Sequence, residues 1–499
     1  MPHENSMDES RAAASGRAAA SGDPAVSDHR AATGYPAATG YPTTTDFLLD
    51  VVDLNRRGRP VGVYSICSSD RLVLEAGMTQ ALRDETVVCI ESTPNQVNQS
   101  GGYTGMTPAR FRAFVESVAT SMQFPLSRLI LGGDHLGPYV WRGEPAEAAM
   151  AKSRQLVREC VLAGYTKIHL DAGMRCADDP VGRDARLDER IVMERTADLC
   201  RAAEAAHAEL PQDSPAPVYV IGAEVPIPGG EQAGEAEVAV TGVGDVARML
   251  TLAKRAFARG GLQAAWERVI AVVVQPGVEF GDDVVVEYAR EKAAALSAFI
   301  ESDRRLVFEA HSTDYQTPAS LRRMIEDHFA ILKVGPALTF AMREALFALE
   351  SIEVELLDGA ARSAAAARGR ARRAATQGDV GVAPSRLRET LDRVMVAHPE
   401  HWRAYFRGDE RELRLARAFS YSDRCRYYWP RPELREARER LLRNLSRASR
   451  PIPMTLLSQY LPGEYEAVRS GELANRPADL VRHRILSAID AYAAACGMR

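Results

Sequence analysis

The chain of 499 residues lacks three features that would place it in a specialised class of protein. No apolar run approaches the ~18–20 residues that a membrane helix requires, so we expect no membrane partner. A net charge of -5 and an isoelectric point of about 6.1 provide no general basic field, which argues against nucleic acid as a partner. The seven cysteines include no CxxC pair and follow no regular spacing, which predicts reduced thiols in a cytoplasmic protein.

Two segments are poor in the large apolar residues from which a core is built. Residues 1–43 contain the imperfect repeats RAAASGRAAASG and AATGYPAATGYP, and we interpret them as a disordered tail. This tail has no continuous apolar stretch typical of a secretion signal, and its acidic residues argue against an organelle transit peptide. Residues 359–383 are rich in alanine and arginine. We interpret them as a solvated linker or insertion, although the arginines could also contact an anionic partner.

Between these two segments, eight short and nearly continuous apolar runs alternate with segments of helical period. Parallel strands that are buried on both faces have this composition. The intervening segments carry apolar residues three and four positions apart, as amphipathic helices do. The eight runs are residues 61–66, 86–91, 128–134, 166–171, 217–224, 269–274, 305–310 and 331–334.

Eight alternating units predict a (β/α)8 TIM barrel over residues 44–358, because this fold typically takes ~250 residues. A doubly wound open sheet is the alternative. That fold usually has fewer strands, and no GxGxxG sequence follows the first run here. Residues 384–499 are charged, rich in leucine and helical in period, which predicts a C-terminal helical domain.

Ionisable side chains occur at the carboxyl ends of most predicted strands, where the active sites of barrels lie. Buried charges are costly unless they are paired or bound to metal. Imidazole and carboxylate groups together suit Zn²⁺, Mn²⁺ or a similar ion, so the pattern predicts a divalent-metal site. The polar residues at these ends are Ser65 and Cys67, Glu91 and Asn95, Asp134 and His135, His169 and Asp171, Glu224, Gln275, Glu309 with His311 and Asp314, and Lys333.

Some of these residues also have a purely structural interpretation. His169 alternates with Ile168 and Leu170 in its strand, so it could be a hydrogen-bonded histidine of the core. Glu309 and Lys333 could pair with each other inside the barrel. Structural ion-pair networks and active sites look alike at this level.

A glycine-rich loop, NQSGGYTGMTPARF, follows the second predicted strand. The backbone N–H groups of Gly101 and Gly102 could closely approach a phosphate or a sugar hydroxyl, and a helix is predicted to begin at Pro108. Glycine-rich loops are common after barrel strands, so the loop alone is a weak indication of ligand binding.

Several stretches together resemble one family, the tagatose-bisphosphate aldolase class II accessory-subunit family. The resemblance extends from about residue 48 over nearly all of the remaining chain. The N-terminal repeats and the tract rich in alanine and arginine depart from it. The stretches are VYSICSSDRLVLEAGM, NQSGGYTGMTPARFRAFV, LILGGDHLGPYVW, KIHLDAGM, GAEVPIPGG, FEAHSTDYQ, LKVGPALTF, YSDRCRYYWP and LLSQYLP.

The resemblance implies a (β/α)8 barrel that acts on ketohexose phosphates, and two hypotheses for its role. The first is a metal-dependent 4-epimerase of tagatose 6-phosphate or tagatose that breaks and re-forms the C3–C4 bond, as an aldolase does. The second is a non-catalytic subunit that stabilises a class II aldolase catalytic partner. The ionisable groups kept at the strand ends favour the enzyme. We also expect a homo-oligomer. No nicotinamide cofactor is expected, because no dinucleotide fingerprint is visible.

The stretch GGDHLG resembles the Asp-His-Gly segment of catalytic class II aldolases, which implies that His135 binds the metal and Asp134 moves a proton. We expect Glu224 and His311 to complete the metal site. Glu309 is the alternative acid or base, and Asp171 is a further catalytic or metal-binding candidate.

Candidate substrate contacts lie outside this set. They are Gly101, Gly102, Gln275, Ser65 and Arg424. Arg424 would reach the substrate phosphate if the C-terminal domain folds over the barrel mouth. Otherwise the aromatic residues beside it, Tyr427, Tyr428 and Trp429, are expected to be core residues of that domain.

Overall fold

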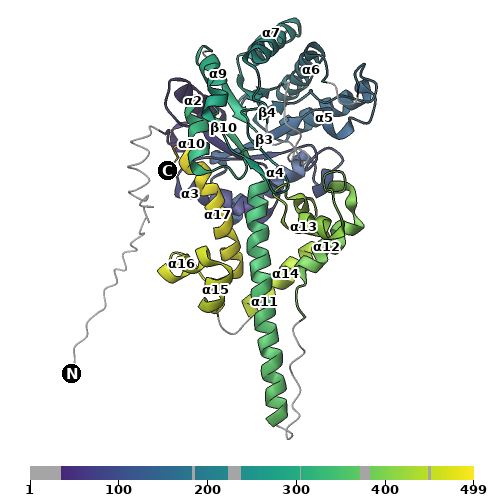
Figure 1. Cartoon of the computed structure of the whole chain (residues 1–499). Helices are drawn as coiled ribbons and strands as arrows, with labels where there is room; N and C mark the ends of the chain where they lie inside the picture. The colour runs from purple at the N-terminus through teal and green to yellow at the C-terminus, as the bar shows by residue number, and fades with distance from the viewer. Residues whose placement is uncertain are drawn as a thin grey trace, which may run out of the picture.

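Eight parallel strands close into a barrel in the computed structural model, which confirms the predicted fold (Figure 1). The structure describes residues 35–182, 186–222, 238–303, 305–370, 383–447 and 451–498. The strand order is β1-β10-β9-β6-β5-β4-β3-β2, and each predicted run supplies one strand. The strands are β1 (Val63–Ile66), β2 (Val88–Ser92), β3 (Leu129–Leu136), β4 (Lys167–Leu170), β5 (Val218–Ile221), β6 (Val269–Val274), β9 (Val307–Ala310) and β10 (Ile331–Val334). A small antiparallel pair, β7 (Glu279–Phe280) and β8 (Val285–Val286), follows β6.

Helices cover the outside of the barrel, so nearly every strand residue is buried, as the continuous apolar runs predict. Side chains of Asp70, Thr107 and Thr317 cap the N-termini of three of these helices, and proline occupies the first helical position after both threonines. The helices are α2 (Thr44–Arg56), α3 (Arg71–Arg83), α4 (Pro108–Ser121), α5 (Ala146–Leu162), α6 (Glu189–His207), α7 (Val243–Arg259), α8 (Gln263–Trp266), α9 (Arg290–Glu301), α10 (Pro318–Glu326) and α11 (Pro336–Arg370).

The C-terminal part is helical, as predicted, and its last helix packs on the barrel. Helix α17 contacts α3, α10 and α11, and the Tyr492 hydroxyl donates a hydrogen bond to the Thr313 carbonyl oxygen at 2.7 Å. The buried residues of this part therefore join the core of the barrel. The helices are α12 (Leu387–Ala397), α13 (Glu410–Phe419), α14 (Pro432–Arg447), α15 (Met454–Tyr460), α16 (Pro462–Ser470) and α17 (Pro477–Ala495).

Two segment boundaries differ from those expected from the sequence. Helix α11 continues through Arg370 and extends well beyond the barrel (Figure 1), although the linker was expected to begin at residue 359. Alanine has the highest helix propensity, so this low-complexity composition continues a helix instead of ending it. At the other end, Tyr35 and Tyr41 pack their rings against Phe47 of α2, so residues 35–43 are not part of a tail. Residues 1–34 and 371–382 lie outside the described ranges.

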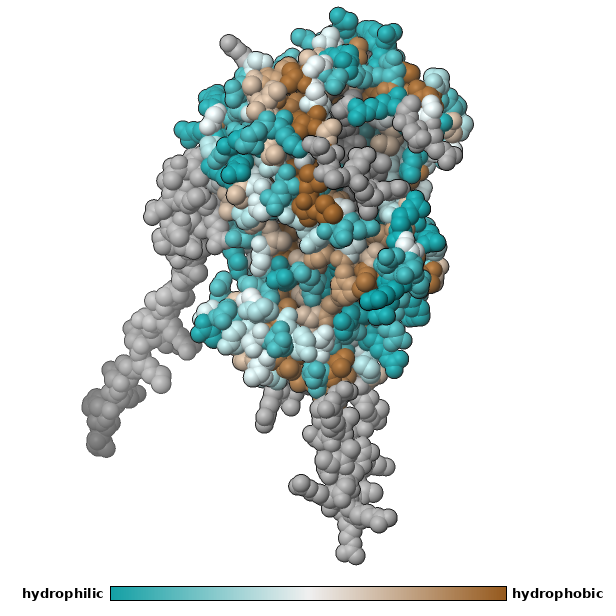
Figure 2. Space-filling view, in the orientation of Figure 1, coloured by the Kyte–Doolittle hydropathy of each residue, from teal (hydrophilic) through white to brown (hydrophobic). Residues whose placement is uncertain are grey.

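The face drawn in Figure 2 is largely hydrophilic. On this face, apolar residues form small groups among polar ones. Across the described ranges, no helix combines the length and apolar character needed to cross a membrane. All seven cysteines are free thiols.

Candidate metal centre

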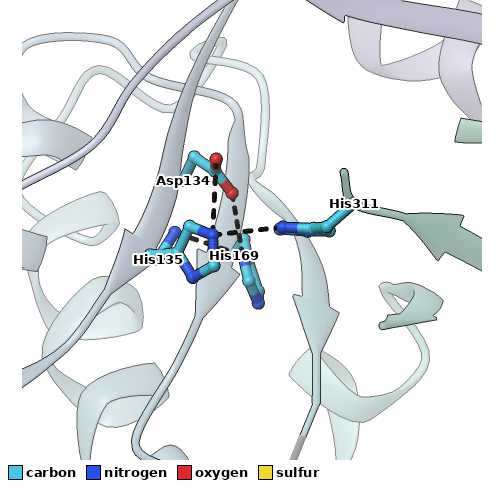
Figure 3. A group of neighbouring side chains, drawn as sticks. All are labelled: Asp134, His135, His169 and His311. Carbon is cyan, nitrogen blue, oxygen red and sulfur yellow. Dashed lines mark hydrogen bonds and ion pairs between the residues drawn. The ribbon is translucent and has the colours of Figure 1, made fainter. Parts of the chain in front are cut away.

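The carboxyl ends of β3, β4 and β9 bring four ionisable side chains together inside the barrel (Figure 3). Asp134 and His135 end β3, His169 lies in β4, and His311 directly follows β9. One potential ligand atom from each of the four lies within 4.8 Å of the others, and all four side chains are buried. The convergence expected of His135 and His311 is therefore present.

An irregularity at the end of β3 points the Asp-His pair into the barrel. The pairing register with β4 shifts between Gly133 and Leu136, and His135 adopts a φ of 52°, in the left-handed region. A bulge of this kind redirects a side chain, and a non-glycine residue in this region carries strain of about 1–3 kcal/mol. A Cβ atom on Gly132 would lie 2.8 Å from the Glu91 carboxylate, so this glycine leaves room for a buried charge. The GGDHL sequence thus shapes the strand end around the two ionisable residues.

Two of the three imidazoles have one nitrogen hydrogen-bonded to a buried carboxylate and the other facing the cluster. His135 Nδ1 lies 2.9 Å from Asp171 Oδ2, and His311 Nε2 lies 3.1 Å from Glu309 Oε1. The two remaining nitrogens, His135 Nε2 and His311 Nδ1, face each other at 3.1 Å. Metal-binding histidines are typically oriented by a carboxylate on their outer nitrogen in this way.

His169 is the third imidazole of the cluster. Its Nδ1 lies 2.9 Å from Asp134 Oδ1 and 3.1 Å from the backbone nitrogen of His135. Its Nε2 is buried, and within the described ranges it has no hydrogen-bond partner. Leaving a buried polar atom without a partner is costly. Three imidazoles and a carboxylate match the ligands that Zn²⁺ and similar ions prefer, so the residues present fit a divalent cation.

A layer of buried ion pairs lies next to the cluster. Lys167 Nζ is 2.6 Å from Glu91 Oε1 and 2.6 Å from Glu309 Oε2. Lys333 contacts Glu91 and lies 3.2 Å from Asp134 Oδ1. The expected pair between Glu309 and Lys333 is the longer contact, at 4.0 Å, because Lys167 is nearer to Glu309.

Charge balance supports a cation at this site. The carboxylates of the cluster and of the ion-pair layer are Glu91, Asp134, Asp171 and Glu309, and the described cations between them are Lys167 and Lys333. With neutral imidazoles, the group retains two negative charges in a buried environment. A divalent cation would neutralise them.

The electrostatic environment favours ionised carboxylates. Burial opposes ionisation of Asp134, but the surrounding histidines outweigh it and lower the pKa of Asp134. Burial is likewise outweighed at Glu309, where Lys167 and His311 lower the pKa to about 2. At His135, Asp134 and Asp171 overcome burial and raise the pKa, whereas burial lowers the pKa of His311. Metal binds ionised carboxylates and neutral imidazoles, so a cation at this site would displace the proton that the raised pKa of His135 favours.

A cavity adjoins the cluster, and Asp134, His135 and His311 form part of its wall. Burial raises the pKa of the Cys67 thiol, so this cavity residue is a protonated neighbour of Asp134, with Sγ at 3.4 Å from Oδ2. Residues of the cavity wall are Cys67, Thr93, Asn95, Gln96, Tyr103, Asp134, His135, Phe280, His311, Ser312, Asp314, Lys333, Val334, Gly335, Pro336, Arg426 and Tyr427.

Three predicted substrate contacts lie away from this wall. The Ser65 hydroxyl is inside the barrel, 3.3 Å from Cys89 Sγ. The Gln275 side chain accepts hydrogen bonds from two backbone N–H groups in its own loop. The Arg424 guanidinium stacks on the Tyr405 ring, 3.3 Å from its centre. Asp171 and Glu309 are also absent from the wall, and Glu224 lies outside the described residues, so its predicted metal role stays a prediction.

The glycine loop contributes a side chain, not its backbone, to the cavity wall. The N–H groups of Gly101 and Gly102 already donate within the loop to the carbonyl oxygen and the side-chain oxygen of Asn98. Both glycines have positive φ angles, and a Cβ atom on Gly102 would lie 2.5 Å from the Gln96 carbonyl oxygen. This tight turn leads into η2 (Gly102–Thr104), which places Tyr103 at the cavity.

Sequence reasoning missed two features of the site. It left His169 undecided, although Lys167, His169 and Asp171 alternate along β4 and therefore share the inward face. It also selected Arg424 in the motif YSDRCRYYWP, whereas the cavity residue is Arg426, in η6 (Arg424–Tyr427). Tyr428 and Trp429 are buried core residues, as the structural interpretation expected.

A family model described as D-tagatose-1,6-bisphosphate aldolase subunit GatZ/KbaZ-like matches residues 48–497. The chain belongs to the GatZ/KbaZ-like family. The resemblance seen in the sequence is therefore confirmed.

Solved structures resemble this chain to different degrees. A probable tagatose 6 phosphate kinase from Sinorhizobium meliloti 1021 is 42% identical to this GatZ/KbaZ-like chain, with a TM-score of 0.74 over 87% of this chain and 100% of the other. Fructose-bisphosphate aldolase from Campylobacter jejuni is 14% identical, with a TM-score of 0.41 over 80% of this chain and 92% of its own. This second similarity is too low to bear on function.

Proposed function

We propose that this member of the GatZ/KbaZ-like family is a divalent-metal-dependent enzyme acting on ketohexose phosphates, most specifically a D-tagatose 6-phosphate (or D-tagatose) 4-epimerase. The observation that carries the proposal is the cluster of His135, His169 and His311 around Asp134, with two imidazoles oriented by carboxylates. Three protein ligands that leave a position open are typical of catalytic, rather than structural, zinc sites.

In this proposal the three imidazoles hold the cation and Asp134 transfers the proton. A bound divalent cation supplies Lewis-acid stabilisation of negative charge on the ketose oxygens. Asp134 is ionised and lines the cavity, so it can accept the proton of the C4 hydroxyl group as the C3–C4 bond breaks. The aldehyde fragment rotates and is attacked on its opposite face by C3, and Asp134 returns the proton to O4. Every bond and proton is restored, and only the configuration at C4 changes.

The neighbouring residues position these groups. Asp171 and Glu309 orient His135 and His311, and Lys333 Nζ lies 3.2 Å from Asp134 Oδ1. Tyr103, Phe280 and Tyr427 add large side chains to the cavity wall. These would restrict escape of the fragments between cleavage and re-addition, which is what separates an epimerase from an aldolase.

The description of the family favours a second candidate, a non-catalytic subunit that stabilises a class II tagatose-1,6-bisphosphate aldolase. Such a subunit gains nothing from a buried His169 nitrogen without a partner. The two candidates differ in one observable property, turnover by the chain on its own.

The test is to purify the chain alone, remove metal with a chelator, restore Zn²⁺ or Mn²⁺, and follow tagatose 6-phosphate by NMR. Fructose 6-phosphate formed only with metal supports the epimerase, and triose products would indicate an aldolase. Turnover that appears only when a class II aldolase catalytic subunit is added would support the accessory role. ADP formed from ATP would instead support a kinase, the activity named for the S. meliloti protein.

A further inference from the structure

The side of the cavity formed by the C-terminal segment has a different chemistry from the metal centre. It is formed by Arg426 and Tyr427 of η6 together with Tyr103 of the glycine loop. The Tyr103 and Tyr427 rings pack edge to face, with centres 4.8 Å apart. Segments more than 300 residues apart in the chain thus meet here and carry hydrogen-bond donors into one cavity.

Three arginines lie around this segment, and only Arg426 presents its charge to the cavity. Arg343 pairs with Asp423 at 2.8 Å, and Arg424 stacks on Tyr405. The Arg426 guanidinium donates to the carbonyl oxygens of Ser422 and Asp423 and, from Nη2, to the Tyr427 hydroxyl oxygen at 3.1 Å.

These partners of Arg426 are uncharged oxygens, and it also lies over the Tyr427 ring, 4.5 Å from the ring centre. Among the described residues, no carboxylate forms an ion pair with it. Asp314 and Asp423 act on it electrostatically without forming an ion pair. Burying a cation without a paired anion is costly, which favours an anionic ligand at this place.

The usual anion site of a barrel is not free in this protein. Barrel enzymes frequently bind phosphate at the loops after the last strands and at a nearby helix N-terminus. Here Asp314 Oδ1 accepts hydrogen bonds from the N–H groups of Gly335 and Ala337 at 3.0 and 2.8 Å, at the start of α11. Those donors are used, and a carboxylate occupies the place of the anion. Lys333, the other cation of the described cavity wall, is engaged by Glu91 and Asp134.

We infer that Arg426, assisted by the Tyr103 and Tyr427 hydroxyl groups, binds the phosphoryl group at the end of the substrate remote from the C3–C4 bond. The substrate class is therefore a ketohexose carrying a terminal phosphate monoester, not the free sugar. This inference rests on the proposed function for the identity of the sugar. The edge of the guanidinium that carries Nε and the second Nη2 hydrogen would meet two phosphate oxygens, and both hydroxyl groups would donate to a third.

Other properties of the two tyrosines agree with this assignment. Burial raises the pKa of Tyr103 to about 12, so its hydroxyl is a hydrogen-bond donor at neutral pH. At Tyr427 burial also raises the pKa, but the positive charges of Arg426 and Arg424 outweigh it and lower the pKa. A phosphate bound here would be attracted by those charges.

Binding of inorganic phosphate to the metal-free chain, measured by calorimetry, tests the site without any turnover. We expect Arg426→Met to weaken phosphate binding by about 100-fold, because it removes a charge-assisted, bidentate contact. Arg426→Lys keeps the charge but loses the fork, so it should show an intermediate loss, and Tyr103→Phe a smaller one. Arg431→Met is the matched control, since Arg431 lies on the same segment but pairs with Glu400 at 3.0 Å. Circular dichroism checks that each variant is folded.

Turnover then identifies the substrate class. Relative to wild type, both with metal, Arg426→Met should raise KM for tagatose 6-phosphate by about 100-fold and lower kcat/KM for free tagatose by a much smaller factor. Equal phosphate binding by folded Arg426→Met and wild-type chains would overturn the inference. So would equal turnover of the phosphate and of a ketose ending in a carboxylate. If the chain binds phosphate through Arg426 but epimerises no ketose, the proposed function is refuted. The inference that Arg426 forms an anion site would still hold.

Discussion

The two ends of the cavity are built in different ways. At the barrel end, Asp134, His135, His169 and His311 project from strands of one closed sheet, and buried carboxylates fix their orientation. At the other end, a short 3-10 turn and a glycine loop present an arginine and two tyrosines. The first end is buried and rich in carboxylates, as a site for bond cleavage beside a cation requires. The second is positive and aromatic, which suits binding and enclosure.

The largest expected effect is the loss of turnover when a metal ligand at the barrel end is removed. His135→Ala should reduce metal-dependent turnover by at least about 1,000-fold, because it removes a ligand without opening the barrel core. The measurement is metal content together with turnover of tagatose 6-phosphate. His207→Ala is the control, since His207 ends α6, is absent from the cavity wall and bonds the Ser214 carbonyl oxygen. Full activity of folded His135→Ala would remove the metal centre from the mechanism.

Asp314 lies between the two ends, and its burial predicts a pH effect on stability. Burial raises the pKa of this carboxyl to about 6, so the folded chain binds a proton more tightly than the unfolded chain. Stability therefore falls as pH rises from about 4 to 6. Asp314→Asn cannot ionise, so its stability relative to wild type should rise by about 2 kcal/mol between pH 4 and pH 7.

Urea unfolding of both chains at the two pH values measures this difference. Because the same pH change acts on all other groups in both chains, the comparison isolates Asp314. A constant difference between the two chains would show that folding does not raise the pKa of this carboxyl.

Replacing a carboxylate that hydrogen-bonds an imidazole should weaken metal binding and leave phosphate binding unchanged. Asp171→Asn should weaken metal affinity about 10- to 100-fold, because the amide orients the His135 ring less well than the carboxylate does. Competition with a chelator measures the affinity, and phosphate binding should stay unchanged. Glu209→Gln, which alters a surface pair with Arg158, is the control. Loss of phosphate binding in Asp171→Asn would mean that the two ends are not independent.

The smallest effect concerns the strand that shapes the metal end. Gly132→Ala should destabilise the fold by about 1–2 kcal/mol, because its Cβ atom would lie 2.8 Å from Glu91 Oε1 and 3.0 Å from the Lys167 carbonyl oxygen. Gly143→Ala is the control, since a Cβ atom there meets nothing within 4 Å. Denaturant unfolding measures the stability of both variants. Equal stabilities would show that β3 can shift to accommodate the added Cβ atom.

The sequence predicted the barrel end better than the other end. Apolar runs followed by Asp134, His135 and His311 can be recognised in the sequence. Because the carboxyl ends of parallel strands in a barrel meet at one rim, these runs predict a shared site. The glycine loop was found, but its backbone donors turned out to be used by Asn98, and Tyr103 is the residue at the cavity. Arg424 was selected from a motif that contains both arginines, and no periodicity in a 3-10 turn distinguishes it from Arg426.

By itself, the sequence determined the closed barrel and the side chains at its strand ends. Strands buried on both faces appear in the sequence as apolar runs, and each run ends where polar residues begin. Tertiary structure alone decided which nitrogen of each imidazole faces the cluster, that Lys167 and not Lys333 is the nearer partner of Glu309, and that Arg426 meets Tyr103. These choices depend on distances between residues far apart in the chain. Packing sets such distances, and no local pattern encodes them.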